Sequence, residues 1–154
     1  MRFFSPTSYS RRVAIFRPEE EARVRALFER LERPVELLVA HGPEATPLPG
    51  ARDVDFAAET ERIVGELAGL SDLLSYRSEH EPPGLARYPA VAVLPEGEDH
   101  GVRYYGLPWG YELGSLIGAI LEAGRRESSL SPDSLERLAA LDRDLAVDVF
   151  VTPT

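Results

Sequence analysis

Cysteine is absent from this chain of 154 residues. No disulfide can therefore form, no thiolate can act as a nucleophile, and no cysteine-ligated metal site can exist. Lysine, asparagine and glutamine are absent too, and all 17 basic residues are arginine. Two explanations of this bias stand side by side: a GC-rich genome, and adaptation to heat, since amides are thermolabile and arginine suits ion-pair networks. The 13 prolines favour a thermophilic source.

Long apolar runs are absent as well. No stretch approaches the ~20 apolar residues that cross a bilayer, and the start, MRFFSPTSYSRR, lacks the apolar centre of a signal peptide. The sequence therefore predicts a cytoplasmic location. The net charge of -9 repels nucleic acid and anionic membranes, so neither is expected as a partner.

Hydrophobic periodicity divides the chain into alternating helices and strands. Helices are predicted within 17–34, 54–71, 107–128 and 131–144, and strands at 35–42, 72–79, 90–94, 101–105 and 145–151. Pro18 suits a first helical turn, Asp53 is the expected cap of the second helix, and Ser131 with Pro132 is expected to start the last one. Strands joined by a helical crossover are parallel and a hairpin is antiparallel. The prediction is an α/β fold with a mixed four-stranded sheet and helices on both faces.

Two stretches carry a resemblance to a known family. Residues 101–154, GVRYYGLPWGYELGSLIGAILEAGRRESSLSPDSLERLAALDRDLAVDVFVTPT, resemble the glutaredoxin-like protein disulfide oxidoreductases of thermophiles, and so do RPVELLVAHG and GELAGLSDLLSY. Members of that family are two thioredoxin-fold units in one chain. The resemblance implies an irregular segment at 1–17, a thioredoxin-like unit at 18–128, and a linker helix with the first strand of a second, missing unit at 129–154. In the family, Cys-Pro-Tyr-Cys follows the motif VFVTPT, so the chain would stop just before the attacking thiol.

The first unit departs from the family pattern at its redox site. Alignment to the family places its two CxxC positions at Val54 and Ala57. Disulfide exchange requires a thiolate stabilised at the start of a helix, and neither side chain supplies one. The unit is therefore expected to be redox-silent, without a cofactor, and the chain by itself is not expected to be an enzyme.

Tyr88-Pro89 precedes an apolar strand, where thioredoxin-like folds hold a cis proline. In such folds the cis bond leaves a neighbouring backbone free to pair with a substrate peptide. The resemblance therefore predicts a cis bond here and a substrate groove at these two residues. An ordinary trans proline that opens a strand is the alternative reading.

Metal and hydrolase chemistry find little support in the sequence. The histidines with carboxylates near them in sequence are His41, His80 and His100, with Glu44, Glu79 and Glu81. Their spacings match no metal motif, so no metal is expected and solvated histidines are the simpler reading. No GxSxG elbow and no phosphate loop occurs. Trp109, in GLPWGYE, is interpreted as a packing residue or a partial surface anchor.

Three hypotheses follow. The leading one is a non-catalytic thioredoxin-fold unit that supports thiol–disulfide exchange by a parent protein, through its structure or its substrate groove, with thiol or disulfide proteins as partners. The second is a protein-binding or homodimerisation module that uses the strand at 145–151, since an unpaired apolar strand favours edge pairing. The third is a hydrolase or metal enzyme on an unrelated fold.

Overall fold

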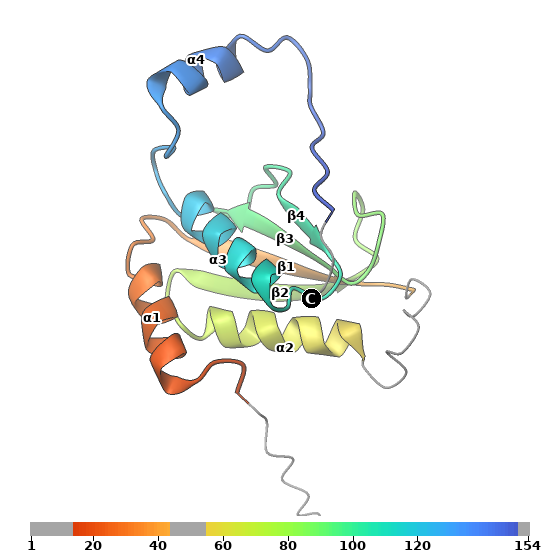
Figure 1. Cartoon of the computed structure of the whole chain (residues 1–154). Helices are drawn as coiled ribbons and strands as arrows, with labels where there is room; N and C mark the ends of the chain where they lie inside the picture. The colour runs from red at the N-terminus through yellow and green to blue at the C-terminus, as the bar shows by residue number, and fades with distance from the viewer. Residues whose placement is uncertain (1–13, 44–54, 151–154) are drawn as a thin grey trace, which may run out of the picture.

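The computed structural model describes residues 14–43 and 55–150, which form a central sheet, three helices packed on it and a fourth helix that stands apart (Figure 1). The elements in chain order are α1 (Pro18–Phe28), β1 (Val35–His41), α2 (Phe56–Ala68), β2 (Leu74–His80), β3 (Ala90–Pro95), β4 (Arg103–Tyr105), α3 (Tyr111–Ala123) and α4 (Pro132–Ala139). Each confirms an element predicted from the periodicity. No helix of the described ranges has the length and apolar character needed to cross a membrane.

The sheet is mixed, as the connections predict. Its strand order is β2-β1-β3-β4. The helical crossover through α2 makes β1 and β2 parallel, whereas β3 is antiparallel to both β1 and β4. The two central strands are therefore β1 and β3, and both are apolar along most of their length.

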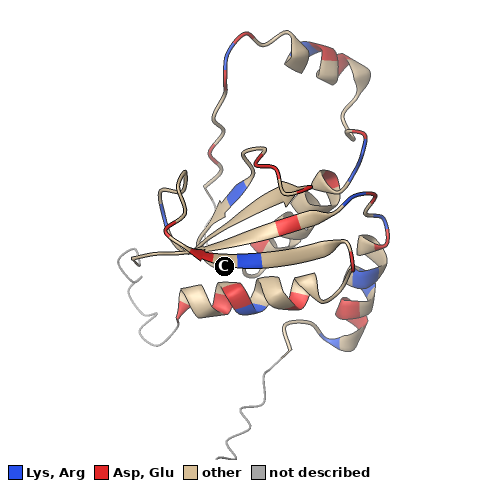
Figure 2. Cartoon of the chain, turned by 180° about the vertical axis from the view of Figure 1, so that it is seen from behind, with Lys and Arg blue, Asp and Glu red and all other residues tan. Residues whose placement is uncertain are grey.

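One hydrophobic core fills the space between the sheet and the helices. Alternate residues of the central strands, such as Val39 and Val91, belong to one buried cluster with side chains of all three packed helices, including Phe28, Ile63 and Leu116. Because side chains alternate across a strand, these residues share one face of the sheet. Helices α1, α2 and α3 therefore cover the same face, and the expectation of helices on both faces is wrong (Figures 1 and 2).

The connection between β2 and β3 explains this one-sided arrangement. A helix there would cover the second face, but residues 81–89 include the sequence Pro82-Pro83-Gly84 and form no helix. Proline lacks the backbone donor of a helix interior, and the residue before a proline disfavours helical geometry. On the face without a helix lies a small separate cluster of buried strand residues, Leu38, Ala92 and Leu94.

The helix starts follow the capping chemistry in the sequence, with one correction. Pro18 opens α1 and Pro132 opens α4, and the Ser131 hydroxyl accepts from the Ser134 amide at 3.2 Å, as predicted. The cap of α2 is Asp55, whose carboxylate accepts from the Ala58 amide at 2.9 Å. The predicted cap, Asp53, lies outside the described residues. Either aspartate satisfies the capping preference, so the sequence alone does not decide between two helix starts half a turn apart.

The predicted strand at 145–151 does not form over its described part. Residues 145–150 are neither helix nor strand, and the side chains of Val147 and Val149 are 82% and 80% exposed. The apolar alternation is present, but a strand also needs a neighbour to take its backbone hydrogen bonds. Within residues 14–43 and 55–150 this segment pairs with none. No residue of the preceding helix α4 is buried either.

Two leucines test whether the stability of the chain resides in the sheet and its three helices. Leu116 of α3 is fully buried, whereas Leu135 of α4 is exposed. Leu116→Ala is expected to lower the free energy of unfolding by about 2–5 kcal/mol. Leu135→Ala changes helix propensity equally but removes no core contact, so we expect a loss below ~0.5 kcal/mol in urea denaturation. Equal losses would show that α4 belongs to the cooperative core.

Candidate functional site

One end of the sheet gathers the residues that the sequence singled out. Strands β1, β2 and β4 finish there and β3 begins there, as the pairs His41–His80 and Ala90–Tyr105 show. The Gly106 amide donates to the Pro89 carbonyl at 2.8 Å, which ties the loop after β4 to the start of β3. We call this end, with His41, His80, Pro89 and Tyr105, the proline end.

The Tyr88–Pro89 peptide bond is cis, as predicted. Pro89 is buried and Tyr88 is half-buried. The Tyr88 ring lies directly against Gly42, where an added Cβ would come within 2.2 Å of ring atom Cδ2. The Tyr88 hydroxyl donates to the Leu85 carbonyl at 3.3 Å. The loop before β3 is thus fixed to the end of β1 by a close contact that requires glycine.

The start of α2 is where the family resemblance places a thiol pair. Ala57 is the second residue of α2, directly after the capped N-terminus at Asp55 and Phe56. Exposed amides and the helix dipole stabilise an anion at such a position. Ala57 supplies only a methyl group. The other aligned position, Val54, lies outside the described residues.

A polar cluster that links α2 to the sheet was not expected from the sequence. The His41 ring atom Nε2 lies 2.6 Å from Ser78 Oγ and 3.2 Å from Glu61 Oε2. A catalytic triad needs the serine and the carboxylate on opposite ring nitrogens, whereas both partners here share one. The cluster therefore connects β1, β2 and α2 and does not activate Ser78. Sequence spacing carries no signal for it, because parallel pairing of β1 and β2 creates the contact.

The other two histidines have separate carboxylate neighbours. His80 lies 3.5 Å from Glu81 and His100 lies 3.4 Å from Glu98. In the described part of the chain no group of three histidine, aspartate or glutamate side chains is placed to hold a metal ion. Glu44 lies outside that part. These histidines are thus arranged as ion-pair or hydrogen-bond partners.

Aromatic side chains are exposed where the chain passes from β4 to α3. Tyr105, Trp109 and Tyr111 are 45%, 51% and 87% exposed. Their neighbour Tyr104 is partly buried against the core, and this burial, followed by the negative charge of Glu112, raises the pKa of its hydroxyl. Trp109 is not part of the hydrophobic core of the described residues. Of its two interpretations, a packing residue or a partial surface anchor, the second agrees better with its exposure.

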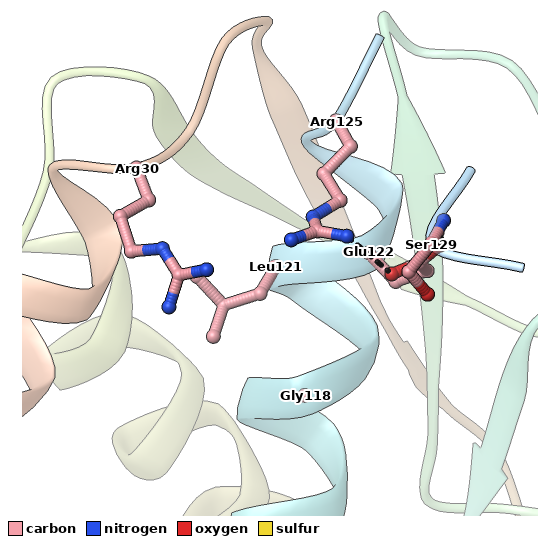
Figure 3. A pocket seen from close by; sticks show the side chains of 6 residues that line it. All are labelled: Arg30, Gly118, Leu121, Glu122, Arg125 and Ser129. Carbon is pink, nitrogen blue, oxygen red and sulfur yellow. Dashed lines mark hydrogen bonds and ion pairs between the residues drawn. The ribbon is translucent and has the colours of Figure 1, made fainter. Parts of the chain in front are cut away.

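A shallow hollow of about 260 Å³ lies away from the proline end, along the second half of α3 (Figure 3). The guanidinium groups of Arg30 and Arg125 stand on either side of Leu121 (Figure 3). Arg125 lies 3.7 Å from Glu122, which also accepts from the Ser129 amide at 2.9 Å. This hydrogen bond lowers the pKa of Glu122. The hollow thus contains a local ion pair and shares no residue with the proline end.

The sheet order, the cis proline and the helix start define a thioredoxin-like fold. Comparison with solved structures agrees. The N-terminal domain of the alkyl hydroperoxide reductase AhpF from Enterococcus faecalis matches with a TM-score of 0.69 at 20% identity, over 83% of this chain and 62% of that one. A protein disulfide oxidoreductase from Aeropyrum pernix matches with a TM-score of 0.65 at 22% identity, over 84% of this chain and 56% of that one. The predicted likeness to that class of protein is confirmed at the level of the fold.

Curated proteins similar in sequence are alkyl hydroperoxide reductases of the same AhpF type. That of Escherichia coli K12 is 27% identical over 130 residues, which are 84% of this chain. That of Staphylococcus aureus MRSA252 is 25% identical over 132 residues. The chain spans about a quarter of the length of these relatives, 23% for both. No family profile matches the chain.

The contact between Tyr88 and Gly42 makes a sharp prediction. Gly42→Ala is expected to lower the free energy of unfolding by about 1–3 kcal/mol, because the new methyl group overlaps the ring. In a Tyr88→Ala background the same change is expected to cost far less, and a double-mutant cycle in urea measures the coupling. Gly118→Ala is the control: open space surrounds it and it lies inside α3, so we expect a small gain in stability. Equal costs in both backgrounds would refute the contact.

Proposed function

We propose that this chain is a redox-silent thioredoxin-fold unit that supports thiol–disulfide exchange carried out by a larger protein. One observation carries the proposal: the fold is thioredoxin-like, but the chain has no sulfhydryl group. Exchange requires a thiolate to attack a disulfide sulfur and a second thiol to leave. A methyl group at Ala57 can do neither, so we do not expect the chain alone to catalyse disulfide exchange.

The proposed role in support of thiol–disulfide exchange rests on the likeness to one part of longer proteins and on the predicted groove. The relatives whose names include reductase or oxidoreductase are longer than this chain, so their activity belongs to proteins of which it resembles one part. Tyr88 and Pro89 remain the predicted groove for a substrate peptide, with partner proteins that carry thiols or disulfides. Such a unit needs no cofactor or metal of its own. The cytoplasm is the location we propose for it.

Disulfide reduction tests the silent unit directly. The purified chain is expected to accelerate the reduction of insulin by dithiothreitol no more than an equal mass of an unrelated cysteine-free protein does, because it offers no sulfur to form a mixed disulfide. Turbidity of the released insulin chain is the readout, and a thioredoxin serves as the positive control. Turnover clearly above the cysteine-free control would refute the proposal.

A second candidate function is homodimerisation through residues 145–151. The exposed apolar alternation of Leu145, Val147 and Val149 favours it, because a segment of this kind pairs readily with a free sheet edge. Light scattering of the whole chain and of a chain lacking residues 144–154 tests it. We expect the deletion to convert a dimer to a monomer. A monomer in both cases would exclude this function.

A further inference from the structure

Strand β4 ends the sheet on one side. Within the described residues it pairs with β3 alone and has no second neighbour. Its three residues are too few to make a long aggregation-prone edge, but they leave backbone donors and acceptors free on the outer side. Peptide segments in extended form add to such edges as extra strands. The edge of β4 is therefore able to accept a short segment.

Arg103, the first residue of β4, has an incomplete set of partners. One terminal nitrogen of its guanidinium group pairs with Asp99. The Nε atom of the same group is buried and has no hydrogen-bond partner within the described residues. A buried donor without an acceptor costs free energy, about 1–3 kcal/mol in typical proteins. The exposed part of the same side chain, which is 25% exposed, gives a carboxylate at the edge of β4 a charge partner.

The segment at residues 146–149 has a pattern of charge and apolar side chains complementary to that of β4. Asp148 stands between two exposed valines, Val147 and Val149, and none of the three has a partner in the described structure. Arg103 likewise stands between an aliphatic and an aromatic residue, Val102 and Tyr104. When Asp148 is placed opposite Arg103, each valine faces one of these two neighbours, whichever way the segment runs. Cross-strand pairs of opposite charge, and pairs of β-branched with aromatic side chains, both stabilise a sheet.

The segment does not occupy the β4 edge of its own chain, because its valines are exposed to solvent. Within the described residues every copy has two edge strands, β2 and β4, and one unpaired segment at its C-terminal side. Exchange of segments between two copies pairs the β4 edge of each copy and closes the assembly as a two-fold dimer. We propose that residues 146–149 of one copy add to β4 of a second copy, with Asp148 of each against Arg103 of the other. This inference rests on the second candidate function above and names its acceptor edge.

Charge reversal at the two positions tests the pairing, with sedimentation velocity as the measure of association. Asp148→Arg places two positive charges in contact, and Arg103→Glu places two negative charges in contact. Each variant alone is expected to dimerise at least ~10-fold more weakly than the unchanged chain. An equimolar mixture of the two variants restores an opposite-charge pair at both junctions, so we expect heterodimers with near-original affinity. Asp142→Arg is the matched control, with the same charge change in an exposed residue outside the segment and an expected change below ~2-fold.

The outcomes separate this inference from the function on which it rests. In one outcome, deletion of residues 144–154 abolishes the dimer while each single charge-reversal variant and the equimolar mixture dimerise with the same affinity. In that case the segment mediates dimerisation at another surface and the β4 pairing is wrong. A chain that is monomeric at all concentrations overturns both. Circular dichroism of each variant checks the fold. Asp148 is exposed and lies in no helix or strand, so its reversal leaves the test valid even if Arg103→Glu unfolds the protein.

Discussion

The burial of β1 and β3 beneath three helices is the constraint on which the rest of the structure depends. Their apolar residues alternate toward a single core that also takes Phe28, Ile63 and Leu116. This packing fixes the register of the strands and therefore the level of the sheet at which each strand ends. The positions of His41 at the end of β1 and of Pro89 before β3 follow from it, and the start of α2 is held over the same core. The geometry of the proline end is thus a consequence of core packing.

The chemistry of that end is separate from its architecture. The fold retains a capped helix start, a cis proline and a glycine that receives the Tyr88 ring. These features position backbone groups and need no sulfur. The reactive step of a thioredoxin-like protein does need it, and no arrangement of methyl, imidazole and carboxylate groups replaces a thiolate in disulfide exchange. The proposed function therefore assigns this scaffold a role in shape or contact and leaves the thiol chemistry to a larger protein.

Much of this fold was predictable because its signals are local. Among the described residues, periodicity located each helix and strand, and the hairpin and crossover rules set the strand directions. Errors arose where a long-range partner decides the outcome. Val147 and Val149 alternate as a strand does but have no neighbour in the described structure, and the second face of the sheet lacks a helix since Pro82 and Pro83 occupy the connection. At the site, Pro89 was predictable from the family resemblance. The contact of His41 with Ser78 and Glu61 was not, because it depends on strand register.

Amide hydrogen exchange followed by NMR measures most directly whether the sheet and its three packed helices form the cooperative body of the protein. The amides of Val39 and Val91, in the two central strands, are predicted to exchange only through global unfolding and to report the full free energy of unfolding. Amides of α4, such as that of Leu138, are predicted to exchange with little protection, because no residue of this helix is buried. Protection of Leu138 equal to that of Val39 would contradict the account.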